Sequence, residues 1–529
     1  MSLAPRTEFW TVHRASWAMG LFALLAVLLT IGDPGITMDE PLDVRPGRTY
    51  VETLMARGLG FFERDTVNRV FRDNAEHPPL GRWLLGIASK GCQPIELIVL
   101  GKDTTNPGLY LRSGRVAPAV CFAILVGLVT STAGRRYGRA GGIAAGFALI
   151  IMPRVFAHAH FGALDTFVAL FWTWALLRLV GAADAERPVR AMAWAGVFWG
   201  LALLTKIHGW LLPPVALAWT LSRLPIRKAV PALAAWTAVG LLVFVAGWPW
   251  LWYDSWDRLV GYFATTGAKR TTTFVQYFGR VYADRDVPWH YPWVYFAATV
   301  PLGLHALGAI GVYHGIRERA HDRFPFLLLG TIAGFLALFS TRVPVYDGER
   351  LFLVVFPLWA IVIGRGFGAI WDDLDGRRWL RRALIAATLA QAAGVVLIHP
   401  LGLSYYNALV GGLRGAERLG LELTYWGDAV NGDLLTTLAD LAPDDAPAAL
   451  APTLVPQQGI VATTRRLARR GIVLRDEDAV GRSEWIVVSR REAYWKPEIR
   501  ALVIQPPVRL IVRDGVWLSG LWRRGAGHH

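Results

Sequence analysis

Charge and cysteine are both scarce in this sequence. Only 18% of the residues are charged, against about 25% in an average soluble domain, and 54% are hydrophobic. There are two cysteines, Cys121 inside an apolar run and Cys92 in a loop, so neither a disulfide framework nor a metal cluster is expected. The sequence also has no internal repeat and no glycine-rich phosphate loop between a strand and a helix. These absences argue against a disulfide-stabilised secreted protein and a nucleotide-dependent enzyme.

Long apolar runs are what the sequence has instead. They lie at 17–31, 115–133, 140–157, 163–181, 192–205, 208–222, 229–251, 292–313, 324–340, 350–364 and 383–398. Runs of this kind cross the bilayer core, about 30 Å thick, as helices, with flanking residues extending the shorter ones. Backbone groups in lipid must bond internally, so the pattern predicts an all-α polytopic membrane protein with about eleven transmembrane helices. The first run follows Arg6 and Arg14 without a clear cleavage site, which predicts a retained signal anchor.

The basic residues indicate the orientation. With the N-terminus in the cytoplasm, alternate loops become cytoplasmic, and each of these loops is basic, as the positive-inside rule requires. They contain Arg135, Arg136 and Arg139; Arg187 and Arg190; Arg223, Arg227 and Lys228; Arg317, Arg319 and Arg323; and Arg377, Arg378, Arg381 and Arg382. The formal net charge of +15 is therefore interpreted as a topology signal rather than as a nucleic-acid-binding surface.

Three large segments fall on the outer side. The first outer loop, 32–113, contains amphipathic stretches at 49–62 and 80–89 that suit helices lying flat on a membrane. The second outer segment spans 252–291. From 399 to 529 the pattern changes to short strand-like runs, with Asp514-Gly515 predicting a hairpin turn. We therefore expect a transmembrane module over 1–398 and a small extracytoplasmic α/β domain over 399–529.

An acidic pair is the first candidate for chemistry. Asp39 and Glu40 follow the first apolar run by a few residues, on the outer side. Two carboxylates at a membrane surface can act as a base or hold a cation, whereas the alternative is a solvated loop start. Later in the same loop, His77 and Arg82 flank Pro78-Pro79, where the prolines suit a helix start that binds an anion. A plain turn before an amphipathic helix is the alternative there.

Further candidates lie in the other outer loops. Asp165 is predicted at or just inside the bilayer, where an ionisable group is costly and often functional. Together with His158 and His160 it suggests a divalent-cation site, although the triplet alone leaves the metal undetermined. Cations that could bind a lipid phosphate also gather on this side: Lys206, Lys269, Arg270, Arg342 and Arg350, the last two flanking Tyr346. Snorkelling at the interface is the alternative for each cation taken singly.

The order and sidedness of these motifs resemble those of the lipid-phosphate-dependent glycosyltransferases of the GT-C superfamily. The likeness is to the protein O-mannosyltransferase and aminoarabinose transferase branch. It is carried by Asp39-Glu40, by His77 to Arg82, by Asp165 and by Leu204-Thr205-Lys206, and it is clearest from 15 to 360. Tyr405-Tyr406-Asn407 and Tyr425-Trp426-Gly427 look like markers of a bacterial subgroup.

The resemblance implies a GT-C type fold and a polyprenyl-phosphate sugar donor. Asp39 would act as the general base, and Glu40 and Asp165 would orient the acceptor, the base or a divalent ion. His77, Arg82, Lys206, Lys269 and Arg270 would bind the donor phosphate, and substrate contacts would come from His158, His160, Tyr346 and Arg350. A bacterial inner membrane is implied, with the N-terminus cytoplasmic and the C-terminal domain periplasmic. The acceptor can be a glycan, a lipid or a protein.

Three alternatives are weighed against this one. A membrane transporter or lipid flippase also has many helices and intramembrane charges, but transporters often show repeats and sites near the midplane. Here the charges collect at one face and no repeat is visible. A ligase-like enzyme that uses a lipid diphosphate would carry its key Arg and His in a late outer loop, and a non-catalytic receptor would leave the acidic pair unexplained.

Overall fold

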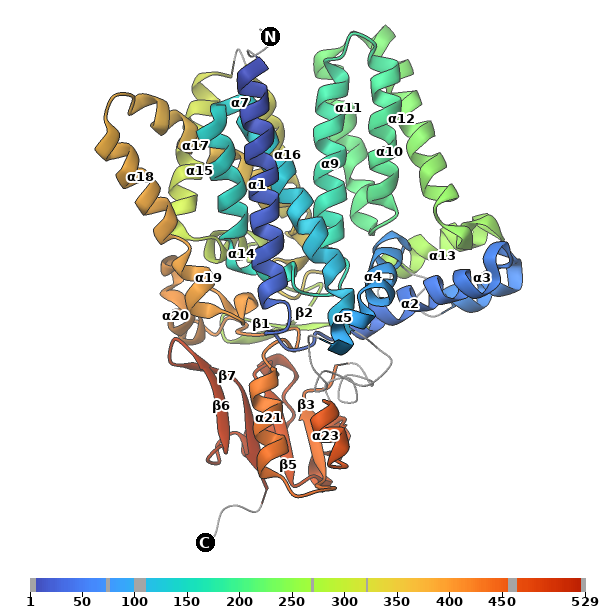
Figure 1. Ribbon diagram of the computed structural model, residues 1–529, viewed down its shortest axis with the longest axis vertical. Coiled ribbons are helices and arrows are strands. Elements are labelled where there is room, and N and C mark those ends of the chain that lie inside the picture. Colours follow the sequence, from blue (N-terminus) through green and yellow to red (C-terminus); the bar gives the residue numbers. More distant parts are fainter. Residues whose placement is uncertain are drawn as a thin grey trace.

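The computed structural model describes residues 6–72, 77–98, 111–267, 271–319, 322–454 and 464–524. A bundle of long helices occupies one half of the molecule, and a region built around a β-sheet lies beyond one end of the bundle (Figure 1). The N-terminal end of the first helix lies at the other end (Figure 1). The small sheet region confirms the predicted fold class of a helical membrane protein with an additional α/β region.

The bundle is formed by helices from most of the chain. They are α1 (Arg6–Thr30), α7 (Val116–Ile150), α9 (Asp165–Ala183), α10 (Pro188–Leu203), α11 (Leu212–Arg223), α12 (Ile226–Ala246), α14 (Tyr291–Thr299), α15 (Leu302–Arg317), α16 (Phe324–Phe339), α17 (Val355–Asp373), α18 (Arg378–Ala390) and α19 (Ala393–Ile398). Among the described residues, six helical segments are long and apolar enough to cross a membrane. The pair α14–α15, bent by 109°, makes a seventh if it is one span, and α10 and α16 are apolar but shorter. The number eleven stays a prediction.

Helix α7 folds back on itself, which explains how it contains two of the predicted spans. Its helical geometry breaks at Tyr137 and at Gly138, where φ is +76°, a conformation that favours glycine. The two halves then pack against each other: a Cβ added at Gly142 would lie 2.6 Å from the Cα of Gly134. Small residues allow this close approach of two helices. The predicted basic loop containing Arg135 therefore sits at the reversal.

The segment 32–113, predicted to be the first outer loop, is largely helical where the structure describes it. It contains α2 (Glu40–Arg57), η1 (Gly58–Phe62), α3 (Arg64–Phe71), α4 (Leu80–Gly91), α5 (Gln93–Ile98) and α6 (Leu111–Gly114), and a later outer segment adds α13 (Ser255–Gly267). Helices α2, α3 and α13 lie across the direction of the bundle helices (Figure 1). Met55 of α2, Leu59 of η1 and Trp256 of α13 are exposed, as expected for amphipathic helices at a membrane surface.

Shorter elements connect the outer ends of the bundle. They are α8 (Pro153–His158), η2 (Ile207–Leu211), η3 (Pro249–Trp252), the hairpin of β1 (Phe274–Tyr277) and β2 (Arg280–Ala283), η4 (Arg350–Phe352), η5 (Gly402–Ser404), η6 (Ala408–Val410) and α20 (Gly412–Arg418). The hairpin reaches the C-terminal region, where the backbone N–H of Phe274 donates to the hydroxyl of Tyr494 at 2.9 Å.

The C-terminal sheet has five strands in the order β4-β3-β5-β7-β6. They are β3 (Ala448–Ala451), β4 (Leu474–Arg475), β5 (Trp485–Ser489), β6 (Arg509–Arg513) and β7 (Val516–Arg523). Strand β3 is parallel to β4 and β5, and β7 is antiparallel to β5 and β6. The predicted hairpin is confirmed: Asp514 and Gly515 have φ of 46° and 73°, which matches the tight turns that hairpins favour.

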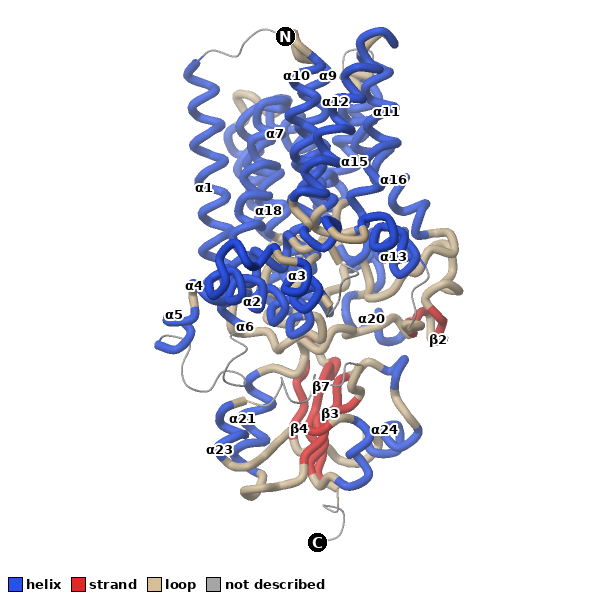
Figure 2. The backbone as a smooth tube through the Cα atoms, turned by 90° about the vertical axis from the view of Figure 1, so that its right-hand side faces the viewer, coloured by secondary structure: helices blue, strands red, loops and turns tan. Residues whose placement is uncertain are grey.

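Helices cover both faces of this sheet (Figure 2). They are α21 (Gly432–Leu441) and α23 (Arg465–Arg469) on one side and α24 (Pro497–Leu502) on the other, with η7 (Glu477–Arg482) and η8 (Glu492–Tyr494) in the connections. The boundary between the two predicted domains, at 398, stays a prediction.

Candidate active site

Arg350 joins three aspartates from different outer loops. It lies at the start of η4, where its Nε donates to Asp165 Oδ2 at 3.1 Å and its Nη1 donates to Asp347 Oδ2 at 3.1 Å. Its Nη2 donates to the carboxylate of Asp39. The guanidinium also lies over the ring of Trp426, 4.4 Å from the centroid. A guanidinium has five donors in one plane, so a single residue can hold several carboxylates in fixed positions.

The second cation of this cluster is Lys206. Its Nζ donates to Asp165 Oδ1 at 2.7 Å, so Asp165 receives one cation on each carboxylate oxygen. Asp165 begins α9, and Lys206 precedes η2. Both are buried, and buried charges are stable when they are paired and hydrogen-bonded. Two predicted site residues from different loops are thereby brought into direct contact.

Asp39 differs from the other two aspartates in its access to solvent. Its side chain is 20% exposed, whereas those of Asp165 and Asp347 are each 2% exposed. All three accept from the same arginine, so geometry does not distinguish them, but exposure does. A general base must reach the proton that it removes. Of the three, Asp39 has the carboxylate that a substrate can approach.

Glu40, next in sequence, is buried in a different set of contacts. Arg115 donates to it twice, at 2.6 and 2.8 Å, and the backbone N–H groups of Thr37 and Gly162 donate at 2.8 and 3.0 Å. Arg115 also donates to the carbonyls of Ile31, Pro34 and Gly35. The pair thus ties the loop that carries Asp39 to the start of α7 and to the loop before α9.

A cavity of about 740 Å³ opens beside Lys206. It is lined by apolar side chains of η2, α13, α16 and the following loop, and by polar groups that include His77, Lys206, Arg285, Arg342 and Tyr346. Ligand pockets commonly measure about 300–1,000 Å³ and combine an apolar wall with a few polar groups. The wall suits a hydrocarbon chain and the basic groups suit a phosphate.

His77 lines this cavity without adding charge to it. Burial and the nearby positive charges of Arg82 and Lys206 hold the pKa of His77 well below its usual value. Its imidazole is therefore neutral near pH 7 and available for hydrogen bonding. Arg82 faces elsewhere: its Nε donates to Asp43 at 3.0 Å. Burial raises the pKa of Asp43 to about 6, although Arg82 opposes the shift.

The two histidines predicted beside Asp165 diverge. His158 lies 3.7 Å from the Glu349 carboxylate and packs near Trp426. His160 instead contacts the hydroxyl of Thr30 at 2.8 Å and the carbonyl of Phe156 at 2.9 Å. In the described part of the chain, no group of three or more His, Cys, Asp or Glu side chains is placed to hold a metal ion. Lys269 and Arg270 lie outside the described residues.

Sequence reasoning missed another buried ion pair next to this cluster, which Arg154 forms with Glu349. Arg154 donates to Glu349 at 2.6 Å and lies over the ring of Tyr406, 4.5 Å from its centroid. Burial alone would raise the pKa of Glu349, but Arg154 lowers it below its usual value. The signal for Arg154 was its position inside the apolar run 140–157, where a charge is costly.

Arg491, which sequence reasoning also missed, links the C-terminal region to the cluster. Arg491, after β5, donates to Asp347 Oδ1 at 2.7 Å, and Asp347 also accepts from Arg350. Arg491 lies 3.6 Å from Glu422 as well. Burial raises the pKa of Glu422 to about 8 and that of Asp428 to about 7. The C-terminal region therefore contributes directly to the arrangement of the candidate site.

The fold and the site define a membrane protein in which the partly exposed carboxylate of Asp39 is linked, through Arg350 and Asp165, to Lys206 in a cavity with an apolar wall. Residues 108–253 match the family model described as "Dolichyl-phosphate-mannose-protein mannosyltransferase". No curated protein matches the chain.

Two similar solved structures are of ArnT from Cupriavidus metallidurans. The apo structure is 16% identical with a TM-score of 0.51, and covers 95% of this chain and 97% of its own. The structure bound to undecaprenyl phosphate is 17% identical with a TM-score of 0.50, and covers 95% and 96%. The chain has the fold of these proteins along almost its whole length. The comparisons therefore show a family match over residues 108–253 and a fold shared with these structures.

Proposed function

We propose that the protein transfers a monosaccharide from a polyprenyl-phosphate donor to an acceptor hydroxyl, with inversion of configuration. The observation that carries the proposal is the position of Asp39: a partly exposed carboxylate, held by Arg350, next to the buried Lys206–Asp165 pair and the cavity. The family match and the structure of ArnT from Cupriavidus metallidurans bound to undecaprenyl phosphate support a lipid-phosphate donor.

The reaction assigns each charge a role. The donor's isoprenoid lies against the apolar wall of the cavity, and its phosphate binds the basic groups beside Lys206. Asp39 removes the proton of the acceptor hydroxyl, whose oxygen attacks the anomeric carbon from the face opposite the phosphate. The bond between that carbon and the phosphate oxygen breaks, and polyprenyl phosphate leaves with the electron pair. A single displacement of this kind inverts the anomeric centre, and Lys206 stabilises the charge on the leaving phosphate.

The neighbours of Asp39 act through position. Arg350 orients the Asp39 carboxylate, and Asp165 holds both Arg350 and Lys206 in place. We assign Glu40 to the same supporting group, because Arg115 and two backbone N–H groups occupy its carboxylate. Such residues keep the reacting groups within the narrow geometry that transfer requires.

The proposed setting is a bacterial inner membrane with the site on the periplasmic side. The supporting observation is that basic loops lie at the end of the bundle where α1 begins, while α2, α13 and the sheet lie at the other (Figure 1). The test uses a phosphatase that is active only when exported. Fused after the last residue, it is expected to be active, because the proposed orientation places the C-terminus in the periplasm. An inactive fusion in a folded, membrane-inserted protein would contradict the proposed orientation and place the C-terminus in the cytoplasm.

The test of the function is transfer of label by the purified chain in detergent. A panel of radiolabelled polyprenyl-phosphate sugars serves as donors and a crude envelope fraction as acceptor. The wild type is expected to transfer one sugar, and Asp39→Asn to lower the rate by about 10²–10⁴-fold, the usual contribution of a general base.

Asp33→Asn is the matched control. Asp33 lies in the same loop but pairs with His399 at 2.8 Å, so transfer should remain near the wild-type rate. Equal activity of wild type and Asp39→Asn would remove the base assignment. Donor binding without any transfer would favour a lipid transporter.

A further inference from the structure

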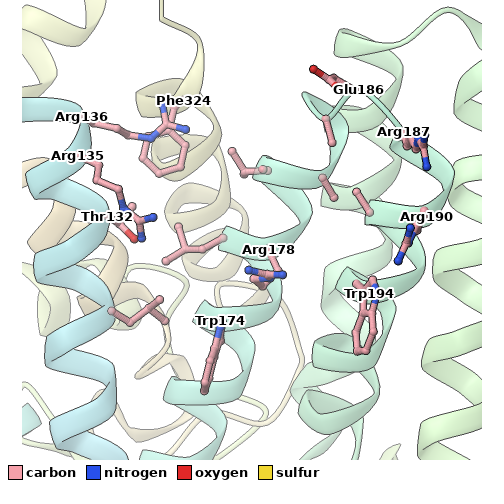
Figure 3. A pocket seen from close by; sticks show the side chains of 17 residues that line it. Thr132, Arg135, Arg136, Trp174, Arg178, Glu186, Arg187, Arg190, Trp194 and Phe324 are labelled. Carbon is pink, nitrogen blue, oxygen red and sulfur yellow. The ribbon is translucent and has the colours of Figure 1, made fainter. Parts of the chain in front are cut away.

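A second cavity, of about 910 Å³, lies at the far end of the bundle from Asp165. It is a groove between the turn of α7, the C-terminal half of α9 and the start of α10, closed by Phe324 of α16 (Figure 3). Arg178, which lines it, follows Asp165 by thirteen residues on α9, a distance of about 20 Å along a helix. The groove is therefore separate from the candidate active site.

Arginines dominate the polar lining of the groove. They come from three helices and the turn before α10: Arg135, Arg136, Arg178, Arg187 and Arg190. Glu186 is the one acidic residue among the described lining residues. In the described part of the chain, only Arg136 of the five has a carboxylate within ion-pair distance, Asp322 at 3.7 Å. The positive charge of the groove is thus largely unbalanced within the protein.

Neutral side chains help to hold three of these arginines in place. Arg135 donates to the hydroxyl of Ser131 at 2.8 Å. Arg136 lies over the ring of Phe324, 3.9 Å from the centroid, and Arg178 lies 5.3 Å from the ring centroid of Phe198. Aromatic faces and neutral acceptors position a guanidinium but leave its charge to be matched by a ligand. In Figure 3, Arg135 and Arg136 lie on one side of the groove and Arg178 lies on the other.

The remaining lining indicates which kind of ligand this is. Leu128, Leu177 and Val180 form an apolar wall, and Trp194 lies at the edge with 59% of its surface exposed. Tryptophan is enriched at the level of lipid headgroups. A soluble anion would use the arginines but leave this wall without an occupant, whereas a lipid uses both.

We propose that this groove binds an anionic phospholipid, with its phosphate on the arginines and its acyl chains along the apolar wall. Basic pockets between transmembrane helices bind multivalent lipid headgroups in this way. Five arginines match a lipid with two phosphates, of the cardiolipin type, better than a lipid with one. The bound lipid bridges α7, α9 and α10 at the face opposite the candidate site.

The proposal is tested on the full chain, delipidated in detergent and examined by native mass spectrometry. The added probes are cardiolipin, phosphatidylglycerol, phosphatidylethanolamine and inorganic phosphate. Cardiolipin is expected to bind most tightly, phosphatidylglycerol next, and the zwitterionic lipid at least about tenfold more weakly, since each basic residue adds to the attraction of an anionic headgroup. Equal binding of the three lipids, or retention of inorganic phosphate alone, would overturn the proposal.

Two triple variants distinguish lipid binding in the groove from general attraction by the positive charge of this face. Arg135→Gln, Arg178→Gln and Arg190→Gln combined should weaken cardiolipin binding by about tenfold or more. The matched control combines Arg377→Gln, Arg378→Gln and Arg382→Gln, three exposed arginines near the start of α18, outside the groove lining; cardiolipin binding should be unchanged. An equal loss of cardiolipin affinity in both triple variants would contradict the assignment of the lipid site to the groove.

Arg187→Gln with Arg190→Gln is the milder second variant, since it changes two arginines at the start of α10 and leaves those of α7 and α9 in place. Helical circular dichroism checks that each variant is folded. Cardiolipin affinity is expected to fall by about threefold or more, and an unchanged affinity in this folded variant would also count against the groove. No donor or acceptor enters the measurement, so its outcome is independent of glycosyl transfer.

Discussion

The two ends of α9 gather positive charge in opposite ways. At the Asp165 end, Lys206 and Arg350 are each paired with carboxylates and nearly buried. At the Arg178 end, the arginines of the groove are mostly exposed and mostly lack a carboxylate among the described residues. Buried charge requires a partner inside the protein, whereas exposed cations at a membrane surface find counter-ions in the lipid. A buried cluster whose charges are paired holds reacting groups in fixed positions. A groove whose positive charges are mostly unpaired favours the binding of an anionic ligand.

The largest stability effect should come from breaking a buried pair at the outer end. Arg115→Met leaves Glu40 buried without its cation and is expected to lower the free energy of unfolding by about 3–5 kcal/mol. Chemical unfolding in detergent micelles, followed by circular dichroism, measures this. The double variant with Glu40→Gln should recover part of the loss, because the uncompensated charge is gone.

Arg64→Met is the control for that comparison. Arg64 pairs with Asp254 at 2.8 Å, but both side chains are largely exposed, so its loss should matter little. A similar cost for the Arg64 and Arg115 variants would break the distinction between buried and exposed pairs.

An intermediate effect is expected from pH. The pKa of Glu422 is raised from an ordinary value of 4.5 to about 8, so the native state holds this proton more tightly than the unfolded chain does. Its contribution to stability is therefore complete below pH 4.5 and is lost as pH rises toward 8, at up to about 1.4 kcal/mol per pH unit.

The thermal midpoint in detergent, measured from pH 5 to pH 9, reports this loss. Glu422→Gln should show a shallower decline up to pH 8, while Asp428, with a pKa of about 7, still contributes in the same direction. Identical pH profiles for wild type and variant would show that Glu422 does not titrate as inferred.

The smallest effect is expected at the opposite end of the bundle. Arg223 and Asp184 form a pair at 2.7 Å with about two fifths of each side chain exposed. Arg223→Gln should change the free energy of unfolding by less than about 1 kcal/mol, measured by the same unfolding titration. A cost near that of Arg115→Met would mean that burial is not what separates the two ends.

Much of the fold follows from local pattern. Apolar runs indicate helices because lipid forbids unsatisfied backbone groups, and Asp514-Gly515 indicates a hairpin because both residues tolerate positive φ. The number of spans is less accessible. Runs 115–133 and 140–157 lie on two helical arms that meet at a reversal at Gly138, and 292–313 is divided into α14 and α15 at a 109° bend.

The candidate site could be predicted from the sequence only in part. Asp39, Asp165 and Lys206 stood out because ionisable groups beside apolar runs are unusual, but the sequence did not show that Arg350 would join two of them. Arg491 was not accessible at all, since nothing local distinguishes it from the other arginines of the C-terminal region.

The sequence by itself determined the membrane class, and it predicted the sidedness of the charges and the loops that carry the candidate chemistry, because these depend on composition and order along the chain. The tertiary structure alone decided which acid is accessible and which is a buried support. Asp39 and Glu40 are adjacent in sequence, yet one meets Arg350 at an open site and the other is enclosed by Arg115. Their difference arises from partners 311 and 75 residues away, which only packing brings together.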